Sequence, residues 1–387
     1  MNQKLLLRAA TMLLTLPLMF SGCGQIPTPS PSVTPNDAQG SDDSNQASQP
    51  SGEAAAPAPS QSTPEGPRVE TFSLGRLTRG EALYEYDGQQ VTRKFFYYIP
   101  STYTEGDRLP LMLSLHGSGS NATMQLGEGR WVDYAEQEGI IIVAPESTAL
   151  HANGKISSEG KLPYEIGQSD AAYVRWAAAS TDPCVQFGVD DVQYLSDLID
   201  LFVNSGYADA ERVYSSGLSH GAFMSLRLAL ELPEKIAGVG IVAGLLCTEF
   251  KDVQMSKSVK IVLIHGTQDT IVPIQGMNYP SGGESTAEQL WAYSSNETVA
   301  WFLEQYGMDN RPTVSQLPDT DPEDGTTITR RAYADEAGRE LIVQYVVDGG
   351  GHTWPGGTQY APISVCGVVS REAQAAELIW SELQAGF

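Results

Sequence analysis

The sequence predicts an α/β fold with a mostly parallel central sheet and helices on both faces. Short apolar runs rich in β-branched or aromatic residues alternate with helical patterns over residues 69–387. Such alternation is typical of parallel strands joined by crossover helices. The run at 140–144 is apolar throughout, as in strands that are covered on both faces. Ligands of this fold class bind beyond the carboxyl ends of the strands, so functional residues are expected there.

The individual elements follow from local patterns. Asp190 and Asp191 suit the first turn of a helix, Pro233 stops a helix that is apolar on nearly all faces, and Gly307 closes another. Strands are expected at 93–99, 111–116, 140–144, 212–216, 259–265 and 341–348, and helices at 189–203, 221–232, 296–306 and 371–383.

Composition excludes several classes of function. The 387 residues include 23 basic and 47 acidic side chains, a formal charge of −24. Nucleic-acid binding relies on Lys and Arg contacts to phosphate, so no nucleic-acid partner is expected, and an anionic membrane surface is disfavoured for the same reason. Four cysteines without a C-x-x-C spacing do not predict a structural zinc site.

The first 23 residues are predicted to be a lipoprotein signal peptide. Lys4 and Arg8 precede an apolar run at 9–20 that is too short to span a bilayer. Phe20-Ser21-Gly22-Cys23 resembles the bacterial lipobox, in which the cysteine is acylated. We therefore expect lipidation of Cys23, which would be the only membrane contact. Ordinary secretion is the alternative, and both place the protein outside the cytoplasm.

A stalk is predicted to follow the signal peptide. Residues 24–68 are rich in Pro and Ser and carry no aromatic side chain, so they cannot form a core. We expect this segment to be disordered and to lead into a single catalytic domain over 69–387.

Gly217-Leu218-Ser219-His220-Gly221 fits the G-x-S-x-G pattern of a nucleophile elbow. A predicted strand precedes it and a buried helix follows, which is the context that an elbow requires. Glycines at both ends allow a sharp turn that exposes the serine hydroxyl. Ser219 is therefore the predicted nucleophile.

A serine hydroxyl needs a base, and the base needs an orienting carboxylate. Of the five histidines, His352 lies in a glycine-rich loop directly after the strand at 341–348. Asp269 follows the strand at 259–265 and is the predicted carboxylate, with Asp348 as the alternative. The order Ser219, Asp269, His352 is the order of α/β-hydrolase triads.

Acyl transfer also needs two N–H donors for the oxyanion. One is predicted to be the backbone N–H of His220. The other is expected from the loop after the strand at 111–116, with Ser118 as first choice and Gly119 as second.

With these residues in place, the chain resembles the secreted polyhydroxybutyrate-depolymerase and feruloyl-esterase branch of the α/β-hydrolase superfamily. This branch is similar to carbohydrate esterase family 1 and includes acetyl-xylan esterases. The resemblance implies an α/β-hydrolase fold and a serine esterase without metal or organic cofactor, and it carries the catalytic triad onto Ser219, Asp269 and His352. It rests on the stretches 116–122, 189–192, 217–222, 265–273 and 350–357, the last containing His-Thr-Trp-Pro-Gly-Gly.

Two long excursions, 145–188 and 275–295, are expected to open on the catalytic face. Trp354, Tyr279 and Trp291 are proposed to wall a substrate pocket, with pinning of loops to the core as the alternative. The acidic run 319–325 is expected to be a hairpin turn rather than a calcium loop, because its sixth position is not glycine. Outside the cytoplasm, Cys184, Cys247 and Cys366 allow at most one disulfide, and the pair cannot be chosen from the sequence.

Together these observations predict a lipid-tethered, extracytoplasmic serine esterase that works through an acyl-enzyme. Feruloyl or acetyl esters on plant polysaccharide are the expected substrates, and polyhydroxyalkanoate is the runner-up. Two further alternatives are a serine peptidase of the prolyl-oligopeptidase type and a non-catalytic glycan-binding lipoprotein.

Overall fold

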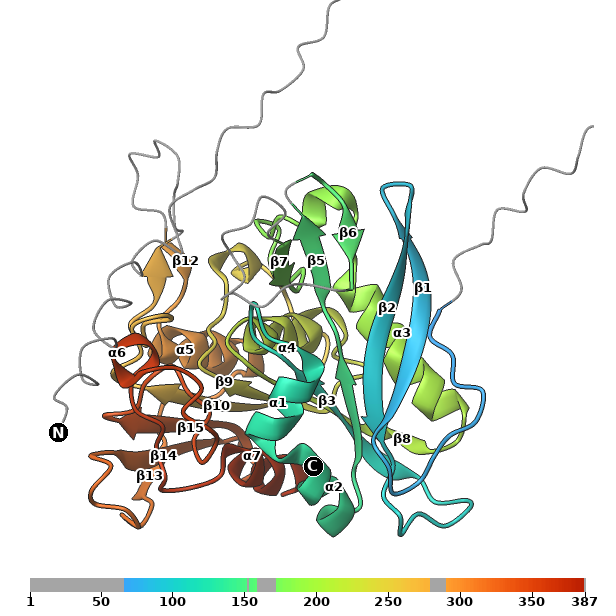
Figure 1. Cartoon of the computed structure of the whole chain (residues 1–387). Coiled ribbons are helices and arrows are strands. Elements are labelled where there is room, and N and C mark those ends of the chain that lie inside the picture. The colour runs from blue at the N-terminus through green and yellow to red at the C-terminus, as the bar shows by residue number, and fades with distance from the viewer. Residues whose placement is uncertain (1–65, 152, 159–171, 279–289, 386–387) are drawn as a thin grey trace, which may run out of the picture. The chain divides into compact units, whose positions relative to one another are not determined.

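A mixed sheet of ten strands runs through the part of the chain that the computed structural model describes, residues 66–151, 153–158, 172–278 and 290–385 (Figure 1). In chain order its strands are β1 (Thr78–Tyr86), β2 (Gln89–Tyr98), β3 (Leu109–Leu115), β4 (Ile141–Pro145), β8 (Ala208–Leu218), β9 (Gly238–Val242), β10 (Lys260–Gly266), β13 (Thr313–Gln316), β14 (Thr327–Ala334) and β15 (Glu340–Asp348). Their order in space is β1-β2-β4-β3-β8-β9-β10-β15-β14-β13. The run from β4 to β15 is parallel, and the strands outside it pair antiparallel.

Helices cover both faces of this sheet. They are α1 (Ala122–Gly129), α2 (Trp131–Glu138), α3 (Asp191–Asn204), α4 (His220–Glu231), α5 (Ser295–Tyr306), α6 (Ile363–Cys366) and α7 (Ala375–Gln384), with 3-10 turns at Val185–Phe187 and Thr248–Phe250. Side chains of α3, α4 and α5 share one core, and those of α1, α2 and α7 share a second. Along β3, Leu111 and Leu113 enter the first core and Met112 the second, as the alternation of a strand requires. The predicted α/β class is confirmed.

Two small sheets lie beside the main one. The first contains β5 (Thr148–His151), β6 (Ile156–Ser157) and β7 (Ala172–Arg175) in the order β6-β5-β7. The second pairs β11 (Met277–Asn278) with β12 (Leu290–Ala292). Both belong to the long excursions that the sequence predicts.

Local caps explain where the predicted helices begin and end. Asp190 caps α3 by accepting a hydrogen bond from the N–H of Gln193, and Ser294 forms a capping box with Glu297 at the start of α5. Gly307 closes α5 at φ 63°. The strands and helices predicted from the sequence are all present within a few residues, although α7 begins at Ala375 rather than at 371.

The described residues fall within one compact unit, Pro64–Tyr279 with Gln289–Phe387. The predicted signal peptide, its Cys23 and nearly all of the predicted stalk lie outside the described residues. Among the helices that are described, none is long and apolar enough to cross a membrane.

Candidate active site

Ser219 occupies a strained turn between β8 and α4. Its backbone has φ 56° and ψ −121°, a conformation that L-residues rarely adopt. The turn is fixed on both sides, because the Ser219 N–H donates to the Val242 carbonyl at 2.9 Å and the Ser219 carbonyl accepts from the N–H of Ala222 at 2.8 Å. The strand, turn and helix of a nucleophile elbow are therefore present at the predicted position.

The glycines around Ser219 let the elbow approach β3. A Cβ at Gly221 would lie 2.2 Å from the carbonyl oxygen of Leu115. A Cβ at Gly217 would lie 2.4 Å from the carbonyl carbon of Gly221. Neither separation is compatible with a side chain, so the two glycines are needed for close packing beneath the serine.

Asp269 and His352 meet at the same edge of the sheet. They follow β10 and β15, which are parallel neighbours, so both loops leave the sheet at the carboxyl ends of the strands. His352 Nδ1 lies 2.7 Å from Asp269 Oδ2, and both residues are buried. The other carboxylate oxygen, Oδ1, accepts from the N–H groups of Ile271 at 2.9 Å and Val272 at 2.8 Å.

These contacts keep the Asp269 carboxylate ionised. Burial opposes ionisation, but the histidine side chains of His265 and His352 outweigh it and lower the pKa of Asp269 to about 2. His265 Nε2 lies 3.5 Å from Asp269 Oδ2 and donates to the Val272 carbonyl at 2.8 Å. An ionised carboxylate at Nδ1 holds the proton on that nitrogen and leaves Nε2 of His352 unprotonated.

Hydrogen bonds to the backbone of His352 hold the loop that carries it. The Tyr360 hydroxyl donates to the His352 carbonyl at 2.8 Å, and the His352 N–H donates to the Cys366 carbonyl at 2.5 Å. A Cβ at Gly266 would lie 2.3 Å from the Gly350 carbonyl oxygen, so the loops after β10 and β15 pack backbone to backbone. The alternative carboxylate, Asp348, is instead exposed and accepts from the Thr267 hydroxyl at 2.9 Å.

Ser219 follows β8, which shares this edge with β10 and β15. Between these described residues no hydrogen bond joins Ser219 Oγ to His352 Nε2. Catalytic hydrogen bonds are often long before substrate binds and tighten in the complex, so the lack of this bond does not exclude the pair.

The loop after β3 lies against the elbow. A Cβ built on Gly117 would lie 3.4 Å from the Cβ of Ser219. Within the described part of the chain, no acceptor engages the N–H of Ser118 or that of His220. The N–H of Gly119 donates to the Val174 carbonyl at 3.0 Å. Gly119 is therefore wrong as an oxyanion donor, because its N–H is already bonded, and Ser118 stays a prediction.

The other buried histidines have partners of their own. His220 Nε2 lies 3.1 Å from Asp182 Oδ1, and the His220 Nδ1 is buried without a partner among the described residues. His116 donates from Nδ1 to the Gly117 carbonyl at 2.8 Å and accepts at Nε2 from the Ser147 N–H at 3.1 Å. Burial lowers the pKa of His116 to about 4, so its ring is neutral at pH 7.

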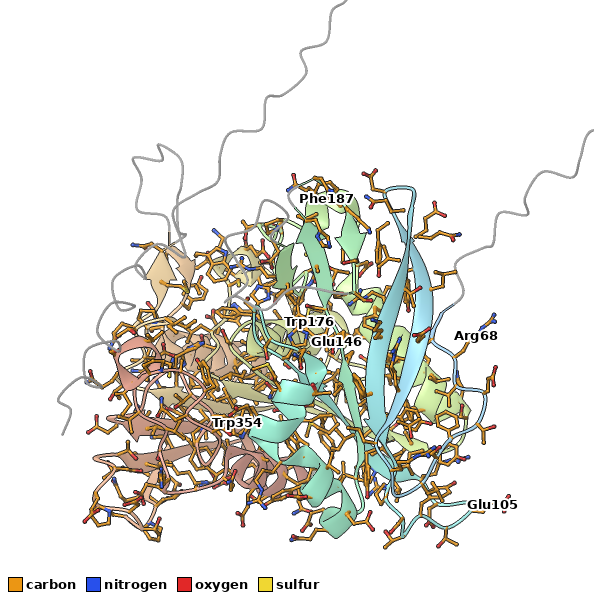
Figure 2. The ribbon with its side chains drawn as sticks, in the orientation of Figure 1. Arg68, Glu105, Glu146, Trp176, Phe187 and Trp354 are labelled. Carbon is orange, nitrogen blue, oxygen red and sulfur yellow. The ribbon has the colours of Figure 1, made fainter. Side chains whose placement is uncertain are left out.

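The structure corrects one of the predicted substrate contacts. Trp354 is fully buried and packs edge-on against Trp131, with ring centroids 6.4 Å apart, and Figure 2 shows it inside the ribbon. Trp354 therefore belongs to the core and does not wall a pocket. Trp291 is partly exposed, and its ring lies tilted against that of Phe223, with ring centroids 5.1 Å apart; Phe223 belongs to α4, one turn beyond Ser219. Tyr279 lies outside the described residues.

The structure also describes the cysteines and the acidic run that the sequence analysis singled out. Cys184, Cys247 and Cys366 are all free and buried, and burial raises the pKa of each thiol. The acidic run 319–325 lies in the connection between the antiparallel strands β13 and β14, as predicted. Its Asp324 accepts from the N–H groups of Thr326 and Arg371. Within the described residues there is no cluster of three potential metal ligands.

Sequence analysis placed Trp176 in the long excursion before α3 but missed its contact with the loop after β3, and it missed Asp182, which contacts the start of α4. Trp176 Nε1 donates to the His116 carbonyl at 2.8 Å, and Asp182 holds the ring of His220. No motif marks these two residues, and only their position in the long excursion before α3 pointed toward the site.

Comparisons with known proteins support an esterase. A family model described as phospholipase/carboxylesterase matches residues 188–282. NocK of Nocardia uniformis subsp. tsuyamanensis, which carries an esterase name, is 29% identical over 69% of this chain and 72% of its own length. The poly(3-hydroxybutyrate) depolymerase of Ralstonia pickettii is 31% identical over 41% of this chain, and the match covers only 30% of that protein.

One of the relatives and one of the similar solved structures carry the name acetylxylan esterase. The bifunctional acetylxylan esterase/xylanase XynS20E of Neocallimastix patriciarum is 25% identical over 48% of this chain and 23% of its own length. The solved acetyl xylan esterase from Aspergillus awamori aligns with a TM-score of 0.45 and 16% identity, over 67% of this chain and 89% of that one.

The sheet order, the strained elbow and the matched family model point in the same direction as the esterase relatives. Together they show an α/β-hydrolase fold and support a carboxylic ester hydrolase.

Proposed function

We propose that Ser219, His352 and Asp269 form the catalytic triad of this esterase, which hydrolyses its substrate through an acyl-enzyme. The observation that carries this proposal is the pairing of two features at one sheet edge. These are a serine held at φ 56° on an elbow and a buried imidazole fixed by a carboxylate at 2.7 Å.

In acylation, Nε2 of His352 takes the proton of the Ser219 hydroxyl as Oγ attacks the ester carbonyl carbon. The N–H groups of His220 and Ser118 donate to the oxyanion that forms. The carbon–oxygen bond to the alcohol then breaks, and the leaving oxygen takes the proton from His352. Asp269 stays ionised and stabilises the imidazolium throughout.

Deacylation repeats these steps with water. His352 takes a proton from the water molecule, whose oxygen attacks the acyl carbon on Ser219. The bond between Oγ and the acyl carbon breaks, Oγ regains a proton from His352, and the carboxylic acid leaves. No step uses a metal or an organic cofactor.

The natural substrates proposed are feruloyl or acetyl esters on plant polysaccharide. Relatives named acetylxylan esterase support the acetyl class. The partly exposed Trp291 beside α4 supports an apolar or flat substrate group near Ser219. A polyhydroxyalkanoate polyester is the second candidate, because two relatives are named depolymerases of such polymers.

An extracytoplasmic location is proposed from the sequence. Residues 1–23 would direct export, Cys23 would carry the lipid anchor, and residues 24–68 would join it as a stalk to a catalytic domain at 69–387. A tethered enzyme with a long stalk suits a polymeric substrate outside the cell.

The experiment compares initial hydrolysis rates of the full chain on methyl ferulate, acetylated xylan and a soluble 3-hydroxybutyrate oligomer. The Ser219→Ala chain is measured in parallel. Hydrolysis that favours ferulate or acetylated xylan and disappears in Ser219→Ala is the expected result. Preference for the hydroxybutyrate oligomer would select the second candidate, and activity that survives Ser219→Ala would reject the triad.

A further inference from the structure

Both proposed oxyanion donors are attached to one short segment, residues 174–182. The donors themselves come from different parts of the chain. Ser118 lies in the loop after β3, and His220 begins α4. Hydrogen-bond donors act on an oxyanion only when both lie within about 2.7–3.1 Å of it, so their spacing has to be held by something that touches both loops.

The segment holds the β3 loop on both sides of Ser118. On the N-terminal side of Ser118, Trp176 Nε1 donates to the His116 carbonyl at 2.8 Å, and the ring centroids of Trp176 and His116 lie 5.1 Å apart. After it, the Val174 carbonyl accepts from the Gly119 N–H at 3.0 Å. The two peptide groups on either side of the one that carries the Ser118 N–H are thus each hydrogen-bonded to the same segment.

The segment also holds the start of α4. Asp182 Oδ1 contacts His220 Nε2 at 3.1 Å, and Asp182 Oδ2 accepts from the N–H groups of Ala178 at 3.0 Å and Ala179 at 2.8 Å. Two turns into α4, Arg227 donates to the Ala177 carbonyl. The residue directly after Ser219 is therefore bonded through its ring to the segment that also fixes Ser118.

The groups that make this connection are buried. Trp176 is fully buried and Asp182 is 3% exposed. A buried carboxylate destabilises a fold unless donors surround it. Here two N–H groups and the His220 ring contact it, and Arg175 lies 3.6 Å away.

We propose that Trp176 and Asp182 are positioning residues, which set the spacing between the N–H groups of Ser118 and His220. This inference rests on the proposed function of Ser219 and its oxyanion donors. Neither side chain touches the reacting atoms. Each acts through a residue that does, so loss of either bond loosens a donor without removing it.

The test compares Trp176→Phe with Trp301→Phe in the full chain. Trp176→Phe keeps an aromatic ring and removes the N–H that holds the His116 carbonyl. Trp301 is the matched control, because its Nε1 donates to the Lys251 carbonyl at 3.0 Å from α5. Asp182→Asn is the second variant and keeps the shape of the side chain while removing its charge.

The readouts are kcat, KM and the affinity of a trifluoromethyl ketone that forms a tetrahedral adduct on the serine. We expect Trp176→Phe and Asp182→Asn to lower kcat by about tenfold or more, within the range seen for weakened oxyanion donors. The ketone affinity is expected to fall by a similar factor, with KM within twofold of wild type. Trp301→Phe is expected to lower Tm and leave kcat unchanged.

A kcat and a ketone affinity in the two variants that match those of Trp301→Phe would overturn the inference. Either variant decides the question if the other fails to fold. A wild-type chain without Ser219-dependent esterase activity would instead reject the proposed function, and that result is obtained before the tryptophan variants are compared.

Discussion

At the scale of single residues, the Asp269 carboxylate is the most constrained group of the proposed triad. It accepts two backbone N–H bonds on one oxygen and contacts two histidine rings on the other. Burial would raise the pKa of Asp269, but the contacts with the two histidine rings lower it, so the carboxylate stays charged where an esterase works. A charge fixed in this way selects the tautomer of His352 that can accept a proton at Nε2.

Asp269→Asn is expected to reduce kcat by roughly 10³–10⁴-fold with little change in KM. An amide cannot stabilise the imidazolium and favours the wrong tautomer of His352. Steady-state kinetics on the preferred ester of the panel measure the effect.

Asp348→Asn is the matched control, because Asp348 is an exposed carboxylate that bonds Thr267 and lies four residues before His352. It is expected to keep kcat near the wild-type value. Equal losses in the two variants would contradict the assignment of Asp269.

The sequence predicted the residues whose role depends on a local motif. It could not predict roles that depend on the direction in which a side chain points. Ser219, Asp269 and His352 each follow a recognisable strand, so their place at the sheet edge could be foreseen. Trp354 lies in the same glycine-rich loop as His352 yet turns into the core, and a glycine-rich loop does not reveal which way a side chain points. The bond from the Gly119 N–H to Val174 joins distant segments and has no signal in the sequence.

At the scale of elements, β9 shows why some strands escape prediction. Its sequence, Gly-Val-Gly-Ile-Val, contains glycines that weaken a strand pattern. In the structure they make room for α7, because a Cβ at Gly238 would lie 2.5 Å from Leu383 and one at Gly240 would lie 2.5 Å from Ile379. Helices α1 and α2 were not predicted for another reason, because each is only eight residues long and carries several polar side chains.

Gly240→Ala is therefore expected to destabilise the fold by about 1–3 kcal/mol, as overpacking does elsewhere. The added methyl group would force α7 away from β9. Urea unfolding of the full chain measures the change in free energy.

Gly127→Ala is the contrasting control. Gly127 lies within α1, and a Cβ there would meet nothing within 4 Å. This variant is expected to gain up to about 1 kcal/mol, because alanine favours helix over glycine. A stability loss of the same size in both variants would contradict the packing argument.

At the scale of the whole molecule, sheet order determines which loops meet. The loops after β3, β8, β10 and β15 leave the same edge because these strands are parallel, and they carry Ser118, Ser219, Asp269 and His352 respectively. The parallel centre could be predicted from alternating strands and helices. The antiparallel edges β1, β13 and β14 could not, because half-exposed polar strands resemble loops in a sequence.

The central claim is that Ser219 is the nucleophile and that His352 activates it. The most direct measurement treats the full chain with a fluorophosphonate and locates the adduct by peptide mass spectrometry. One phosphonyl group on Ser219 is expected, absent in Ser219→Ala and formed far more slowly in His352→Ala. An adduct on another residue, or labelling of Ser219 at an unchanged rate without His352, would contradict the account.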